Sequence, residues 1–174
     1  MTHEQLTQMI GTATHDVFST MLGIELEDGE SYVDDAPPAP AEGVLALVGL
    51  AGTWAGSGTV ACSATLARHI SGQLLMQEFQ HVDEEVLDAM GEVCNMILGN
   101  VKTLLEEHLG PMGLSIPTVI FGRNFTTRSV AKSQWSVVKF NCAGEVLEVH
   151  LCLVPSRETS VTHRHPAVLS LNNS

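Results

Sequence analysis

The 174-residue chain has few basic and few aromatic side chains. Its 8 Lys plus Arg residues stand against 20 Asp plus Glu residues, so the formal net charge is −12 at pH 7. A charge of this sign repels the phosphate backbone of nucleic acids and anionic lipid headgroups alike. Aromatic residues make up 5% of the chain, so no stacking platform for single strands is expected. The sequence therefore argues against nucleic acid and membrane surfaces as partners.

The chain also lacks a long apolar run and paired cysteine motifs. Its longest apolar stretch, residues 43–52, has about half the roughly 20 residues that a membrane-spanning helix needs. The first residues contain no basic segment followed by an apolar one, so a secretory signal is not expected. The four cysteines occur singly and are interpreted as reduced packing residues: Cys62, Cys94, Cys142 and Cys152. We therefore expect a cytoplasmic protein.

The remaining composition is that of one globular domain. Apolar residues, including Tyr and Cys, make up 44% of the chain and charged residues 16%, which is enough apolar surface for a substantial core. Apolar positions recur at helical spacing over residues 4–22 and 83–108, and Ser63 is placed to cap a third, shorter helix. Gly23 follows the first of these helices and Gly110 the last, where each is expected to end.

Strands are predicted mainly in two hairpins. These pair residues 43–50 with 58–62, and residues 135–142 with 145–154. In residues 145–154 leucine and valine alternate with Glu148, His150 and Cys152, which predicts one core face and one wetter face. A short strand is also expected over residues 117–121, and exposed connections over residues 34–40 and 125–133. Residues 55–59 are expected to form a turn, because they lack the third glycine and the Gly-Lys-Ser/Thr of a phosphate-binding loop.

Together these elements predict an α/β domain of the α+β type in residues 1–154. Two long helices and a shorter one are expected to cover one face of a mostly antiparallel sheet of about five or six strands. Residues 155–174 have no apolar periodicity and are expected to be a mobile tail, with His163 and His165 in it as solvated side chains rather than metal ligands. No internal repeat is evident.

The predicted helix over residues 83–108 carries two different stripes. One is apolar and suited to cover a sheet: Val86, Met90, Val93, Ile97, Val101 and Leu104. The other is mostly polar: Asp88, Glu92, Asn95, Gly99 and Lys102. Because residues three or four apart are neighbours on a helix, the β-carbons of Glu92 and Asn95 are expected about 5–6 Å apart. The helix therefore presents an exposed acid and amide pair on a rigid element.

A solvated helix face is the ordinary interpretation of such a stripe. Two residues argue against it here. Asn95 is a poor mid-helix residue because its amide competes for backbone hydrogen bonds, and Gly99 costs about 1 kcal/mol relative to Ala in a helix interior. A face that keeps both is suited to the close approach of a partner.

The motif Asp88-x-x-x-Glu92-x-x-Asn95, followed by Gly99, resembles the D/S-x3-E-x2-N signature of the CheC, CheX and FliY phosphatases. Members of that family hydrolyse the aspartyl phosphate of the chemotaxis response regulator CheY. The order of elements over residues 1–154 also resembles CheX. The first helix has no Glu and Asn at the signature spacing, so one site per chain is expected, which favours CheX over CheC.

The resemblance implies roles for four residues. Asn95 would position the attacking water, which suits a reaction that needs orientation more than covalent chemistry. Glu92 would pair with the lysine in the regulator's active site, and Asp88 and Gly99 would serve docking. No metal or cofactor of this chain's own is implied, because the Mg²⁺ would belong to the phosphorylated receiver domain. A homodimer joined at sheet edges near the C-terminal hairpin is also implied.

The sequence leaves two alternatives to this phosphatase assignment. The first is a non-catalytic CheX-like module that docks a receiver domain or a motor component. The second is a carboxylate metal site at Glu85, Asp88 and Glu92, which is disfavoured because no His follows either Glu at the third position. A thiol nucleophile is not supported either, since Cys94 is expected to point about 100° away from Asn95, toward the apolar stripe.

Overall fold

The computed structural model describes residues 1–35, 42–123 and 134–156. Its helices are α1 (His3–Val17), the π-helix η1 (Phe18–Leu22), α2 (Ala64–Leu75) and α3 (Glu84–Leu109). Its strands are β1 (Glu27–Asp34), β2 (Glu42–Gly52), β3 (Trp54–Cys62), β4 (Met112–Leu114), β5 (Thr118–Arg123), β6 (Trp135–Cys142) and β7 (Glu145–Pro155). None of the helices in these ranges is long and apolar enough to span a bilayer.

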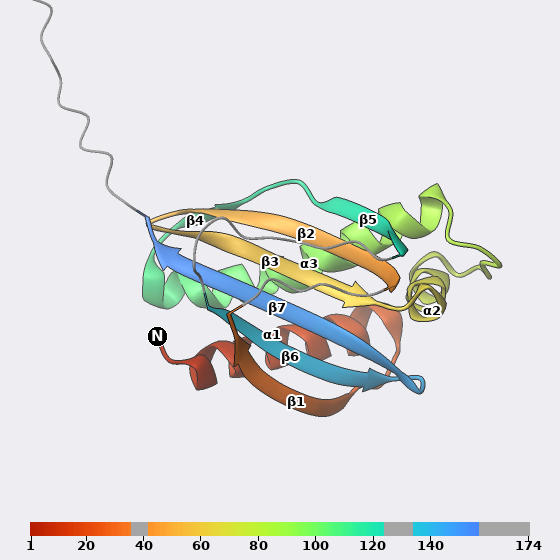
Figure 1. Ribbon diagram of the computed structural model, residues 1–174, viewed down its shortest axis with the longest axis horizontal. Helices are drawn as coiled ribbons and strands as arrows, with labels where there is room; N and C mark the ends of the chain where they lie inside the picture. The colour runs from red at the N-terminus through yellow and green to blue at the C-terminus, as the bar shows by residue number, and fades with distance from the viewer. Residues whose placement is uncertain (36–41, 124–133, 157–174) are drawn as a thin grey trace, which may run out of the picture.

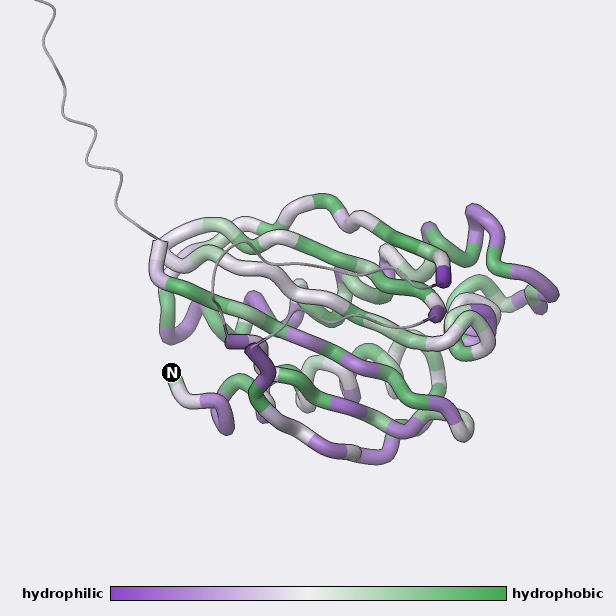
Figure 2. Tube along the Cα trace, viewed as in Figure 1, coloured by the Kyte–Doolittle hydropathy of each residue, from purple (hydrophilic) through white to green (hydrophobic). Residues whose placement is uncertain are grey.

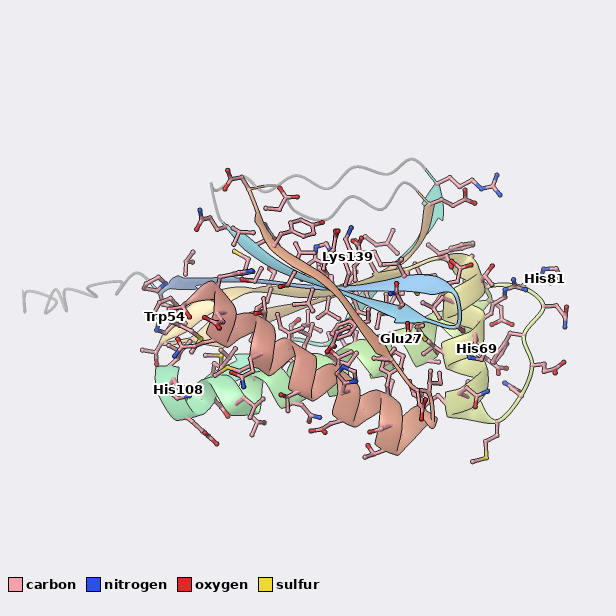
Figure 3. The ribbon with its side chains drawn as sticks, turned by 90° about the horizontal axis from the view of Figure 1, so that it is seen from below. Glu27, Trp54, His69, His81, His108 and Lys139 are labelled. Carbon is pink, nitrogen blue, oxygen red and sulfur yellow. The ribbon has the colours of Figure 1, made fainter. Side chains whose placement is uncertain are left out.

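The strands form one antiparallel sheet, and the helices cover one of its faces (Figure 1). The strand order is β1-β6-β7-β3-β2-β4, with β5 also paired to β2. Figure 3 shows the helices on one side of the sheet and Lys139 on the other. The predicted fold class is confirmed, but the described residues form seven strands. The additional strands are β1, whose eight residues are all exposed, and the three-residue β4.

The sheet has an approximate twofold topology that the sequence did not indicate. When β1 is exchanged with β5, β2 with β6, and β3 with β7, the order β1-β6-β7-β3-β2-β5 becomes the same order read from the other edge of the sheet. In the same way, α1 precedes the edge strand β1, and α3 precedes the edge strand β5. The two halves therefore each place a long helix beside an edge strand, although their side chains differ.

Each α-helix begins at a side-chain cap. The side chains of Thr2, Ser63 and Asp83 accept hydrogen bonds from backbone N–H groups in the first turns of α1, α2 and α3, at 3.2, 3.1 and 3.0 Å. Such caps satisfy N–H groups that the helix itself leaves unpaired. Gly23, with φ of 63°, ends the first helical segment in the left-handed region that glycine adopts at little cost. The predicted starts of all three helices, and the predicted ends of the first and the last, are confirmed within a residue or two.

The main core lies between the helices and the inner face of the sheet. Its fully buried large side chains come from every helix and from the central strands: Phe18, Phe140, Ile10, Leu66, Ile70, Met90, Ile97, Leu98, Leu105, Leu147 and Leu151. Figure 2 shows the contrast between apolar stretches in β2 and the hydrophilic connection between α2 and α3. All four cysteines are buried and free, as predicted.

The side chains on the opposite face of the sheet are less exposed to solvent than the alternation predicted. His150 is 3% exposed, and Cys152 packs with Trp135 and Val137 in a second buried cluster. Glu148 is half-buried and lies 3.0 Å from His150 and 3.4 Å from Lys139. Strict alternation within one strand places side chains on two faces, but it does not say whether the second face is covered.

Residues 55–59 lie within β3, so the predicted turn is wrong. A β-carbon on Gly56 would collide with the backbone carbonyl of Cys152 in β7, and one on Gly58 would lie 2.6 Å from Leu98 Cδ1 in α3. The glycines therefore permit close approach of a strand and a helix rather than a change of chain direction. The chain reverses direction at Thr53, between the end of β2 and the start of β3.

The C-terminal hairpin is confirmed, with Ala143 and Gly144 at positive φ in its turn. Strand β7 and its pairing with β3 continue one residue past position 154. Pro155 pairs with Trp54, and the Ser156 N–H donates to the carbonyl of Thr53 at 3.0 Å. The expected loop over residues 125–133 and the rest of the expected tail, with both of its histidines, lie outside the described residues, as does most of the expected loop over residues 34–40.

Candidate functional site

Helix α3 is held in one orientation by its buried stripe. Five of the six residues predicted for that stripe are completely buried: Val86, Met90, Val93, Ile97 and Val101. Leu104 is only half-buried, and its neighbour Leu105 takes the core position. This small shift follows from the 3.6-residue period over a 26-residue helix. The opposite stripe is thereby directed away from the sheet.

The structure places the four predicted site residues along this outward side of α3. Asp88 and Glu92 are exposed, and Asn95 and Gly99 are half-buried. A β-carbon on Gly99 would meet no atom within 4 Å, so the helix surface is open there. Lys102, the last residue of the predicted stripe, pairs with Glu106 at 2.7 Å. The acid and the amide therefore share an open helix face.

A groove of about 570 Å³ lies directly beside Asp88 and Glu92. Its lining comes from α3 on one side and from the start of β5 on the other: Glu84, Leu87, Asp88, Gly91, Glu92, Pro117 and Val119. The β5 wall could not be predicted from the sequence, because a local pattern does not indicate which strand a helix will lie against.

Gly91 is what lets α3 approach this wall. A β-carbon at this buried position would lie 3.2 Å from Val119 Cγ2, tighter than ordinary van der Waals contact, and would touch Pro117 Cγ at 3.4 Å. A glycine inside a long helix lowers its stability by about 1 kcal/mol. That local cost, immediately before Glu92, is a sequence signal that could have indicated a close tertiary approach, but the prediction rested on Gly99 instead.

The carboxylates of this groove have no cationic partner among the described residues. Glu84, Asp88 and Glu92 form no ion pair there. By contrast, Lys102, Arg123 and Lys139 each lie within 4 Å of a carboxylate elsewhere: Glu106, Glu42 and Glu148. The α3 face is therefore a negatively charged surface that favours a cationic group of a partner.

The cysteine next to the signature is not available for chemistry. The Cys94 side chain is completely buried, and this burial raises the pKa of its thiol to about 12. A thiol is nucleophilic as its thiolate, so Cys94 is a packing residue, and its predicted orientation toward the apolar side is confirmed.

Glu85 does not join the other two carboxylates at a common point. Its Oε2 accepts a hydrogen bond of 2.7 Å from Gln77 Nε2, in the connection that leads into α3. Among the residues that the structure describes, no three His, Cys, Asp or Glu side chains are grouped as metal ligands. The groups available at the α3 face are thus an amide, carboxylates and apolar walls, which can bind and orient a partner and a water molecule.

Solved structures of chemotaxis proteins share this fold. The CheX protein of Desulfovibrio desulfuricans is 31% identical with a TM-score of 0.75, and the match covers 86% of this chain and 99% of that one. A CheX–CheY–BeF3–Mg²⁺ complex from Borrelia burgdorferi matches at 26% identity and a TM-score of 0.73, over 84% of this chain and 96% of that one.

Sequence comparison agrees with the fold. The CheY-P phosphatase CheX of Thermotoga maritima is 29% identical over 123 residues, which cover 70% of this chain and 77% of that protein. The family model described as chemotaxis phosphatase CheX matches residues 44–141, more than half of the chain. The chain belongs to the CheX family. The predicted resemblance is therefore confirmed.

Proposed function

We propose that this protein is a phosphatase that hydrolyses the aspartyl phosphate of a CheY-like receiver domain. The observation that carries the proposal is the outward pair of Glu92 and Asn95 on the rigid helix α3, beside an open and negatively charged groove. The Thermotoga relative is named a CheY-P phosphatase, and the Borrelia relative was solved in complex with CheY. Both names support a phosphorylated receiver as the substrate.

In this proposal the chain supplies orientation and the receiver supplies the metal. The Asn95 amide holds a water in line with the phosphorus, and hydrolysis breaks the bond between phosphorus and the aspartyl oxygen. Glu92 pairs with a lysine of the receiver and thereby sets the docking angle. Asp88 adds negative charge to the docking surface, and the bare backbone at Gly99 leaves room for the receiver to approach. The Mg²⁺ stays on the receiver.

The proposal is tested by substituting the amide and the acid separately. Asn95→Ala should lower kcat by about 100-fold with little change in KM, because it removes an interaction made mainly in the transition state. Glu92→Ala should raise KM as well as lower the rate, because it removes a charge used in docking. The measurement is the loss of phosphate from a phosphorylated CheY-type receiver, with and without each variant.

Helix α3 offers a matched control for each of these changes. Asn100 and Glu107 are exposed on the same helix but lie outside the signature stripe, so Asn100→Ala and Glu107→Ala should leave both constants unchanged. Full activity in the Asn95→Ala, Glu92→Ala double variant would refute the assignment of the site. Binding of the receiver without any acceleration by the unmodified protein would instead establish the non-catalytic docking module.

The negative groove gives a second observable for docking. Charge steering is screened over about 10 Å at 0.1 M salt, so association with a receiver that presents lysine should slow as salt rises. The rate can be followed by stopped-flow fluorescence. An association rate that is independent of salt would contradict an electrostatic role for this face.

We further propose a homodimer joined through an edge strand of the sheet. Both strands of the C-terminal hairpin are paired on each side, so the edge nearest to that hairpin is β1. This strand carries Glu27, Asp28, Glu30 and Asp34, whose charges repel a second copy across a twofold axis. A dimer at β1 should therefore tighten with added salt in sedimentation experiments. A dimer indifferent to salt would place the contact at the β5 edge.

The proposed phosphatase domain comprises the predicted residues 1–154 together with Pro155 and Ser156, which the pairing with β3 includes. We place the protein in the cytoplasm. Its four buried free thiols fit a reducing compartment. Fractionation of cells that express the full chain tests this placement.

A further inference from the structure

We propose that the receiver docks across the groove beside Glu92 and against Ile116, which serves as an apolar anchor of the interface. This inference rests on the proposed function and names the surface and the residue that would set receiver affinity. The anchor lies outside the family signature, on the segment that leads into β5.

Ile116 is an apolar side chain that the fold leaves almost entirely uncovered. It is 87% exposed, although burial of a large apolar side chain is favourable. Single exposed apolar residues are common on protein surfaces. Ile116 differs from an ordinary case because of its rigid support and its position.

The backbone on both sides of Ile116 is held in place. The Gly49 N–H in β2 donates to Ser115 Oγ at 2.9 Å, and the Ser115 N–H donates to the Gly49 carbonyl at 2.9 Å. The Ser115 hydroxyl also donates to the Ile116 carbonyl at 2.9 Å. The next residue is Pro117, whose φ is restricted by its ring. An anchor presented on a fixed backbone loses little entropy when a partner covers it.

This segment is continuous with the proposed site. Pro117 directly follows Ile116 and forms the groove wall that faces α3, and Glu92 lines the same groove. A receiver that brings a lysine to Glu92 therefore also meets the wall at Pro117 and comes close to Ile116. The complementary surface on the receiver carries basic side chains toward Glu84 and Asp88, and an apolar side chain against Ile116.

The other half of the molecule shows that the fold does not require such a surface. The corresponding groove between α1 and β1 is lined almost entirely by polar residues and glycine, with Val138 as its single large apolar side chain. His15 and Asp28 are paired within it at 2.7 Å. Apolar walls are thus a property of the α3 side, where the acid and amide pair lies.

The test uses the full chain and a CheY-type receiver loaded with BeF3⁻ and Mg²⁺, which can bind but cannot be hydrolysed. Ile116→Ser should weaken binding by about tenfold, the effect of losing a well-placed apolar contact. In turnover with phosphorylated receiver, KM should rise by a similar factor while kcat is unchanged. Met76→Ser is the matched control, because Met76 is 93% exposed and lies after α2, away from the groove.

Thermal melts and sedimentation of both variants must match the unmodified protein, so that folding and oligomeric state are held constant. A selective loss of affinity in Ile116→Ser supports the docking surface. Unchanged affinity, or an equal loss in Met76→Ser, overturns it even if the protein is an active phosphatase. If the unmodified protein binds the receiver but does not hydrolyse its phosphate, the proposed function fails while the binding experiment still decides the docking surface.

Discussion

The contact between Gly58 in β3 and Leu98 in α3 allows a quantitative test of how the signature helix is seated. A β-carbon on Gly58 would lie 2.6 and 2.8 Å from the two δ-carbons of Leu98. Leu98 is completely buried and lies three residues after Asn95, so it anchors the helical turn that carries the amide. Gly58→Ala therefore forces Leu98 to move inside a packed core.

The expected costs follow from the geometry. Overpacking by one methyl group should lower the free energy of unfolding of Gly58→Ala by about 1–3 kcal/mol. Leu98→Ala alone removes a buried side chain and should cost about 2–5 kcal/mol. In the double variant the added methyl group enters the space that Leu98 vacates. Its total cost should therefore be smaller than the sum of the two single costs by about 1 kcal/mol or more.

Urea titrations of the two single variants and the double variant measure these differences. For a chain of this size, Tm should fall by about 2–4 °C for each kcal/mol lost. Gly49→Ala is the control, because a β-carbon there would lie 3.6 Å from Ser115 Oγ in ordinary contact, and its stability should be unchanged or slightly raised. Additive costs within about 0.5 kcal/mol, or a Gly58→Ala variant as stable as the unmodified protein, would refute this packing argument.

Three further outcomes are expected. Ile97→Ala, which truncates a completely buried residue of α3, should lower the unfolding free energy by about 2–5 kcal/mol in urea titration, and a loss below about 1 kcal/mol would place Ile97 outside the core. The pKa of Glu148 is lowered from its usual 4.5, chiefly by its hydrogen bond with His150, so the stabilisation is present above 4.5 and is lost as pH falls through the lower folded value. Glu148→Gln should therefore reduce the loss of thermal stability as the pH falls below 4.5, and an unchanged pH dependence would contradict this. Burial raises the pKa of Cys62 and Cys94 to about 12, so neither thiol should be alkylated by iodoacetamide at about pH 8 before unfolding; rapid labelling of the native protein would show that they are accessible.

The local parts of the structure could be predicted from the sequence. Helix α3 begins directly after its cap Asp83, where the predicted helix starts, and the two stripes of that helix lie on opposite sides as their spacing required. The hairpin around Ala143 and Gly144 followed from alternation on either side of a turn. The acid and amide pair of Glu92 and Asn95 was found because its three-residue spacing is itself local. In each case the determining contacts lie within a few residues along the chain.

Features that depend on partners far along the chain could not be predicted in this way. Strand β1 is entirely exposed and shows no apolar alternation, so only its pairing with β6 makes it a strand. Gly56 was likewise predicted to lie in a turn, and only the close approach of β7 explains why a glycine stands there. The groove next to Glu92 exists because Gly91 lets α3 pack against Pro117 of a distant segment. Sequence periodicity determines which side of an element is apolar, whereas the choice of neighbour is made by packing complementarity between surfaces that no local pattern records.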